Sequence, residues 1–129
     1  DVPVALPALP RAQKLQKRAA RVNFDWPDAG AVLAKLEEEI LELRQAMQAD
    51  SPADIEEEMG DILFSCANLA RHLGLDAEAS LRRATSKFER RFSLMEAQAS
   101  DSGSALEMLS AEALDELWEA AKRRERGTV

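Results

Sequence analysis

Four carboxylates in the first half of the chain have the types and the spacing of a metal site. Glu39 and Glu42 are three residues apart, and so are Glu58 and Asp61. On a helix, residues three apart project from the same face, so each pair can present its oxygens together. Carboxylate oxygens are the ligands that Mg²⁺ and Mn²⁺ prefer. The two pairs could therefore hold a divalent cation if two helices bring them opposite each other.

Two amphipathic helices are predicted to carry these pairs. The first runs over about 29–48, with Asp28 as its cap. The second opens after Ser51, has Pro52 at its first helical position and stops at Gly74. Because the loop between them is short, the two helices should pack antiparallel and bring the carboxylates together. The predicted apolar faces consist of Leu33, Leu36, Ile40, Leu43 and Met47 in the first helix, and Ile55, Met59, Ile62, Leu63, Cys66, Leu69 and Leu73 in the second.

A polar stripe follows the second of these helices beside its apolar face. It consists of Glu58, Asp61, Ser65, Asn68 and His72, spaced alternately by three and four residues. Such a stripe borders a cleft more readily than it fills a core. His72 is expected to end the helix beside Gly74 rather than to act as a base, and Cys66 is expected in the core. Spacing alone leaves two readings open, a metal site and a solvated acidic surface, although carboxylates gathered without a cation would repel each other.

The rest of the chain also predicts helices. Residues 1–10 contain three prolines and are predicted to be an extended arm or linker, followed by one domain over 11–129. Helices are expected over about 11–22, from about 76 to 99 and from about 110 onwards. The helix ending near 99 is expected to bury Leu81, Phe88, Phe92 and Met95. With no tyrosine and few glycines, the composition favours an all-α fold, an antiparallel bundle of about five helices.

Charge and hydropathy exclude several classes of partner. The net charge of −7 argues against general binding to nucleic acid or to anionic membranes, which needs a basic surface. We find no apolar run of roughly 20 residues, as a membrane span requires, and no signal-peptide pattern at the start. The single cysteine allows no internal disulfide. These features predict a cytoplasmic protein that recruits an anionic substrate locally, through a cation or a basic cluster.

One basic stripe could serve that purpose. Arg83, Lys87 and Arg91 lie four residues apart, so they share one face of their helix while Phe88 and Phe92 turn inward. The stripe could neutralise the outer phosphates of a triphosphate, or it could form ordinary surface ion pairs. Trp118 in the last helix could likewise stack on a base or pack against the core.

Three segments resemble the MazG family of nucleoside triphosphate pyrophosphohydrolases. They are KLEEEILEL at 35–43, EEEMGDILFSCANLARHLG at 56–74 and ATSKFERRF at 84–92, and the turn RVNFDWPD at 21–28 adds a narrower signal. In detail the chain is similar to the C-terminal domain of the two-domain bacterial MazG protein, from about Arg11 to Glu125, and the resemblance does not extend to the N-terminal domain of that protein.

The resemblance implies hydrolysis of NTP or dNTP between the α and β phosphates, giving NMP and pyrophosphate. It assigns Mg²⁺, with Mn²⁺ as a substitute, to Glu39, Glu42, Glu58 and Asp61. Glu38, or another carboxylate with a free oxygen, could take the proton of the attacking water. Nucleotide contacts in relatives match the ranges 35–38, 54–57 and 87–91; from these and the last helix we select Lys35, Glu38, Glu57, Lys87, Arg91 and Trp118. Asp54 departs from the family pattern, because some relatives carry a lysine there.

Several alternatives remain at this point. The substrate could be narrower, as in a dUTP- or dCTP-type pyrophosphatase. The chain could instead be a non-catalytic module that binds a protein partner through its basic last helix. The sequence argues against a di-iron bundle, because the Glu-x-x-His pairs usual in such bundles are missing. It also contains neither a Walker A loop nor a GxGxxG motif.

We also expect a homodimer. The apolar faces of the two central helices exceed what one small bundle covers, and dimers are usual in the family that the chain resembles. The active site should then lie near the subunit contact, with the basic helix at 11–21 and the last helix beside the acidic pairs.

Overall fold

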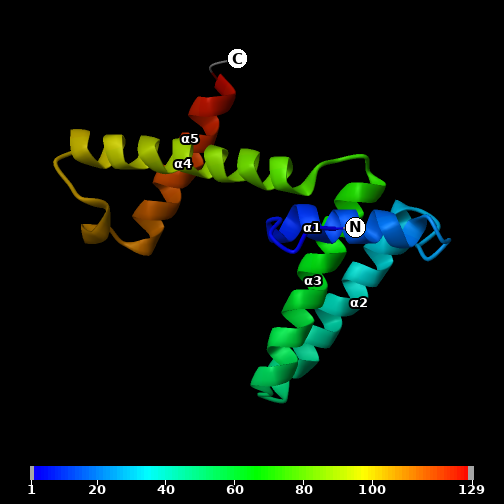
Figure 1. Ribbon diagram of the computed structural model, residues 1–129. Coiled ribbons are helices and arrows are strands. Elements are labelled where there is room, and N and C mark those ends of the chain that lie inside the picture. The colour runs from blue at the N-terminus through cyan, green and yellow to red at the C-terminus, as the bar shows by residue number, and fades with distance from the viewer. Residues whose placement is uncertain (1, 128–129) are drawn as a thin grey trace. The chain divides into compact units, whose positions relative to one another are not determined.

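The computed structural model describes residues 2–127, and these residues form helices and no strand. The prediction of an all-α fold is confirmed (Figure 1). None of the helices formed by the described residues is long and apolar enough to cross a membrane. The elements are α1 (Ala8–Ala20), α2 (Ala29–Gln48), α3 (Pro52–His72), α4 (Ala77–Asp101), the short 3₁₀ helix η1 (Leu106–Met108) and α5 (Ala111–Gly127).

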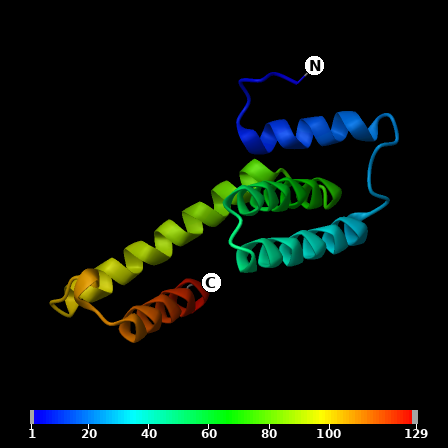
Figure 2. The same ribbon diagram turned by 90° about the horizontal axis from the view of Figure 1, so that it is seen from below.

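The helices belong to two compact units. One unit extends to Ser80 and contains α1, α2 and α3, and the other begins at Leu81 within α4 and contains α5. In the first unit α3 lies between α1 and α2, and it contacts both of them (Figure 2). The first unit therefore carries both predicted carboxylate pairs.

Helices α2 and α3 form the antiparallel pair that the sequence predicts. Asp28 caps α2, since its Oδ1 accepts a hydrogen bond from the backbone N–H of Ala31 at 2.8 Å. After α2 the chain turns at Asp50, whose φ of 51° is left-handed, and the Ser51 N–H donates back to the Ala46 carbonyl at 3.2 Å. This tight reversal places α3 alongside α2.

The face that each helix turns inward matches the prediction only in part. The predicted residues that are partly buried are Leu36, Leu43, Ile55, Ile62 and Leu69. Leu33, Ile40, Met59 and Leu63 are all exposed by 44% or more, and Cys66 is exposed rather than in the core. The buried positions include Val32 and Glu39 of α2 and Ser65, Ala67 and Asn68 of α3. The polar stripe of α3 was therefore wrongly expected to border a cleft at Ser65 and Asn68. It is covered there because α3 is packed between α1 and α2.

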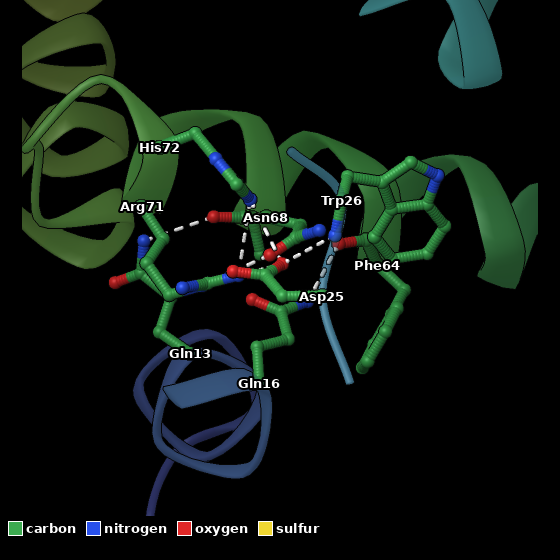
Figure 3. Close-up of polar contacts among 9 residues, drawn as sticks. Gln13, Gln16, Asp25, Trp26, Phe64, Asn68, Arg71 and His72 are labelled. Atoms are coloured by element: carbon green, nitrogen blue, oxygen red, sulfur yellow. Dashed lines mark hydrogen bonds and ion pairs between the residues drawn. The ribbon is translucent and has the colours of Figure 1, made fainter. Parts of the chain in front are cut away.

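Hydrogen bonds from two glutamines attach α1 to α3. The Gln13 side-chain amide donates to the carbonyls of Ala67 at 2.9 Å and Leu75 at 3.2 Å, and its Oε1 accepts from the Ala77 N–H. Gln16, which is 6% exposed, donates to the Phe64 carbonyl at 3.0 Å (Figure 3). These bonds fix α1 along the C-terminal half of α3.

Helix α1 begins three residues earlier than predicted. Pro7 stands at its N-cap, and Ala8, Leu9 and Pro10 form its first turn. The last three residues of the predicted arm are therefore helical. A proline is tolerated at Pro10 because backbone N–H groups in the first turn of a helix have no intrahelical acceptor.

The turn between α1 and α2 is fastened to the end of α3 by Asp25. Its Oδ1 accepts hydrogen bonds from Arg71 Nη2 at 2.6 Å and from the Trp26 N–H at 2.9 Å, and it lies 2.9 Å from His72 Nε2 (Figure 3). His72 is the last residue of α3, and Gly74 follows with a φ of 74°. The prediction that His72 ends this helix is confirmed.

In the second unit α5 packs on part of α4. Met95 is buried at 7% exposure, as predicted, but Leu81, Phe88 and Phe92 are exposed by 56%, 55% and 39%. Among the described residues of this unit, α5 and the preceding loop are the parts available to cover α4. The ring of Trp118 lies 5.4 Å from that of Phe88, between centroids. The expected burial of those three residues is therefore wrong for this unit.

Candidate metal centre and substrate contacts

Three predicted metal ligands meet between α2 and α3. Glu39, Glu58 and Asp61 each offer a carboxylate oxygen, and these oxygens all lie within 4.8 Å of one another. Glu39 is 5% exposed, Glu58 is half-buried and Asp61 is exposed, so the group opens from the helix interface towards solvent. The antiparallel pairing brings the two motifs together, as the spacing predicts.

The raised pKa of Glu58 indicates that the carboxylates around it are not fully neutralised by nearby positive charges. Burial, hydrogen bonds with Glu39 and Glu42, and the charges of both residues raise the pKa of Glu58 to about 7. Its Oε2 atom is buried and has no hydrogen-bond partner among the described residues. Either a proton or a cation would relieve the repulsion among these carboxylates.

Glu42 is the fourth predicted ligand, and it lies beside Glu58 rather than within the closest group. Its charge and a hydrogen bond both contribute to the raised pKa of Glu58. The group of three oxygens within 4.8 Å does not include it. The sequence therefore placed all four carboxylates in one neighbourhood, with Glu42 at its edge.

Lys35 and Glu38 adjoin the carboxylates on α2. Lys35 Nζ is 3.4 Å from Glu39 Oε1 and 3.6 Å from Glu38 Oε1. The charges of Glu39, then Glu38, raise the pKa of Lys35 above its usual range. The Glu38 side chain is 60% exposed, so its carboxylate is open to solvent at the edge of the group.

The start of α3 contains the residues 54–57, which were predicted to contact the nucleotide. Glu57 is exposed. Asp54 accepts a hydrogen bond from Ser51 Oγ at 2.9 Å, so it takes part in the first turn of the helix. This bond gives Asp54 a local structural role at the start of α3.

Predicted substrate residues of the second unit cluster around Trp118. Arg91 lies over the Trp118 ring, with its Cζ 5.4 Å from the ring centroid, and its Nε donates to Glu125 Oε1 at 2.6 Å. Arg90 donates to the other Glu125 oxygen at 3.1 Å. Arg91 therefore shares the aromatic surface with Phe88, and our expectation that it points away from that surface is wrong. Lys87 is exposed.

Sequence reasoning missed two carboxylates that organise these regions. Glu125 binds Arg90 and Arg91, and the hydrogen bonds of Arg91 and Arg90 lower its pKa. Asp25 accepts a hydrogen bond from Arg71 and lies within hydrogen-bond distance of His72. The available signals were weak: an acid within the basic run of the last helix, and an acid inside the turn at 21–28.

Comparison with known proteins places this arrangement in a family. Residues 29–93 match the MazG nucleotide pyrophosphohydrolase domain. The chain is 48% identical over 129 residues to a nucleoside triphosphate pyrophosphohydrolase of Escherichia coli K12, covering 97% of this chain and 48% of that protein. It is 48% identical over 117 residues to the nucleoside triphosphate pyrophosphohydrolase/pyrophosphatase MazG of Thermotoga maritima, covering 91% of this chain and 45% of that protein.

A third relative is the uncharacterized protein YabN of Bacillus subtilis, 42% identical over 127 residues, which cover 98% of this chain and 26% of that protein. The chain spans about half the length of the first two relatives. The match to the domain extends over half of the chain and includes both carboxylate motifs and the segment 84–92. The chain belongs to the MazG nucleotide pyrophosphohydrolase family.

Proposed function

We propose that this chain is a magnesium-dependent nucleoside triphosphate pyrophosphohydrolase. It would cleave an NTP or dNTP between the α and β phosphates and release NMP and pyrophosphate. The observation that carries the proposal is the meeting of Glu39, Glu58 and Asp61 oxygens within 4.8 Å, beside Lys35. Family membership and the names of the relatives support the same reaction class.

The residues present fit a divalent cation. All of the nearby donors are hard carboxylate oxygens, which suit Mg²⁺ or Mn²⁺. The buried, unpartnered Oε2 of Glu58 is an acceptor that lacks a positive partner. Glu39, Glu58 and Asp61 would hold the cation, with Glu42 completing the set. When bound, the cation would act as a Lewis acid towards the phosphates and increase the acidity of a water molecule.

The chain's own residues would supply the remaining chemistry. Glu38, exposed at the edge of the carboxylates, would accept the proton of the attacking water. Lys35, Lys87 and Arg91 would neutralise the phosphate chain. Trp118 would contact the base, and Glu57 the rest of the nucleotide.

The first test is an assay of pyrophosphate release. Purified protein should release pyrophosphate and NMP from NTP in the presence of Mg²⁺ or Mn²⁺, and EDTA should abolish the reaction. Activity that persists at full rate in EDTA would refute the assignment of the metal. Comparing eight common NTPs and dNTPs would show whether the enzyme is general or restricted to a dUTP- or dCTP-type substrate.

A non-catalytic module is the competing function, and Glu42→Gln separates the two. An enzyme should lose metal affinity and activity with this change, whereas a module that binds partners through its last helix should tolerate it. Normal partner binding together with undetectable hydrolysis by the wild-type protein would favour the module.

We also propose that the protein is a homodimer. The described helices α2 and α3 leave a broad apolar surface open to solvent, and burial of such a surface between two copies is favourable. Its members are Leu33, Ile40, Leu41, Met47, Met59, Leu63 and Phe64. Sedimentation equilibrium at micromolar concentration tests this point: an active sample with a mass near the 14.3 kDa of one chain would refute it.

A further inference from the structure

Lys35 is the cation that the structure places against the carboxylate group of the first unit. Its ammonium lies 3.4 Å from Oε1 of Glu39, a side chain that is only 7% exposed, and 3.6 Å from Glu38. The Lys35 side chain is 35% exposed, so its flexible stem has room to move into solvent. The same lysine is therefore close enough to neutralise a metal ligand and free enough to leave it.

We propose that Lys35 is shared between Glu39 and the substrate. Without a divalent cation its ammonium neutralises Glu39, and when Glu39 becomes a metal ligand Lys35 is released to bind the phosphate chain of the incoming nucleotide. This inference rests on the proposed function and specifies how its metal and nucleotide sites are coupled.

The argument follows from the charges around Glu39. Glu58 and Asp61 bring carboxylate oxygens within 4.8 Å of a Glu39 oxygen, so an uncompensated Glu39 would be repelled by both of them. Lys35 provides one positive charge at 3.4 Å, whereas a divalent cation between the three oxygens would provide two. Once Glu39 donates its charge to that cation, the attraction that holds Lys35 weakens and the cation repels the ammonium.

Release would change what the site can bind. A paired Lys35 has little attraction left for phosphate, while an unpaired ammonium binds phosphate strongly as a point charge. The nucleotide would then be held well only after Glu39 is engaged. Metal-free nucleotide would be discriminated against, because Lys35 would stay with Glu39.

The decisive experiment measures metal and nucleotide binding separately in Lys35→Gln. Calorimetry without nucleotide should show Mg²⁺ binding about two- to fivefold tighter than in the wild type, because the competing ammonium is gone. Affinity for a non-hydrolysable αβ-methylene NTP with Mg²⁺ should fall about tenfold. A residue with a purely structural role would weaken both affinities when removed, so the opposite signs identify sharing.

Two matched variants control for the loss of one positive charge and for the shape of the side chain. Arg82→Gln removes one positive charge from an exposed position of α4 and should change neither affinity. Lys35→Arg keeps the ion pair and should restore Mg²⁺ affinity to near that of the wild type. Unchanged or weaker Mg²⁺ binding by folded Lys35→Gln would overturn the proposal.

If Lys35→Gln misfolds, the proposal can still be tested by a measurement on the wild-type protein. The ¹⁵N signal of the Lys35 ammonium should shift as Mg²⁺ is titrated and shift again when the nucleotide analogue is added. A Lys35 signal that is unmoved at saturating Mg²⁺ would contradict release. In that case persistent Mg²⁺-dependent pyrophosphate release would leave the proposed function standing, whereas absence of metal binding and hydrolysis would remove both.

Discussion

Asp25, which contacts α3, and Glu58, which belongs to α3, lie in opposite electrostatic environments. Asp25 is surrounded by donors, with Arg71 at 2.6 Å and His72 at 2.9 Å. Burial raises its pKa, but the hydrogen bonds and charges of Arg71 and His72 outweigh burial and hold it below its usual range. Glu58 is surrounded by acceptors, and burial together with Glu39 and Glu42 raises its pKa to about 7.

The difference distinguishes a carboxylate with a structural role from one that we propose as a metal ligand. Asp25 has donors at hand and fastens a turn to a helix end, so it needs nothing from solution. Glu58 keeps a buried oxygen without a partner. Perturbation of this kind, with burial and like charge acting together, is typical of sites that await a cation or a substrate. The following changes test whether the two carboxylates differ in this way.

The largest effect is expected at the centre of the acidic group. Glu39→Gln and Asp61→Asn should each lower kcat/KM by about 100-fold or more, because each removes a charged ligand from the cation. Steady-state kinetics over a range of Mg²⁺ concentrations would measure the loss. Glu96→Gln, at an exposed position of α4, is the matched control and should retain wild-type kinetics. Unchanged turnover in either ligand variant would disprove the site.

At the other carboxylate the expected loss is of stability. Asp25→Ala leaves the half-buried Arg71 and His72 without their shared acceptor, and it should lower the free energy of unfolding by about 1–2 kcal/mol. Urea denaturation monitored by circular dichroism would measure the change. Asp25→Asn keeps one acceptor oxygen and should lose less. If Asp25→Ala is as stable as the wild type, the contacts of the turn contribute nothing.

A pH titration of metal-free protein should show opposite signs at the two carboxylates. Because the pKa of Glu58 rises from 4.5 to about 7 on folding, the folded state binds more protons between these values. Stability in EDTA should therefore fall as pH rises through this window. The lowered pKa of Asp25 acts the other way, with stability lost as pH falls through its folded value.

Glu58→Gln isolates the contribution of Glu58 to this pH dependence. The variant should flatten the decline above pH 4.5 and melt at a higher temperature than the wild type at pH 7.5 in EDTA. Calorimetric melting curves at several pH values would show it. A wild-type decline that survives in Glu58→Gln would assign the effect to other groups.

The smallest effects are expected in the second unit. There Arg91, like Asp25, already has a partner of opposite charge, and Lys87 is exposed. Lys87→Ala should raise KM for NTP a few-fold, roughly the loss of one exposed charge, without changing the melting temperature. Arg91→Ala should raise KM and also lower the melting temperature by about 2–5 °C, because it loses Glu125 and the Trp118 ring. Equal melting temperatures for both variants would show that the contacts of Arg91 do not stabilise the fold.

The parts of the fold that could be predicted depend on local sequence. Asp28, Pro52 and Gly74 mark helix ends through their own backbone preferences, and α2 spans the predicted range 29–48. The carboxylates also followed from local spacing, since two short motifs on helices joined by a tight turn must approach each other.

The inward faces could be predicted only in part, because distant contacts help to determine them. Gln13 and Gln16 bond to backbone carbonyls of α3 that lie 54 and 48 positions away. Ser65 and Asn68, which spacing alone assigned to a cleft, are buried in the same part of α3. Both faces of α3 repeat every three or four residues, so periodicity does not say which one is covered. The pairing of Arg91 with Glu125, 34 residues apart, was hidden for the same reason.

The exposed thiol of Cys66 gives this chain a built-in chemical reporter of association. It lies on the same side of α3 as the exposed residues Leu63 and Met59, three and seven positions earlier. A second copy covering that surface would shield the sulfur, so its rate of reaction with a thiol reagent should fall as protein concentration rises. The single cysteine makes the reading unambiguous, and it requires no substitution.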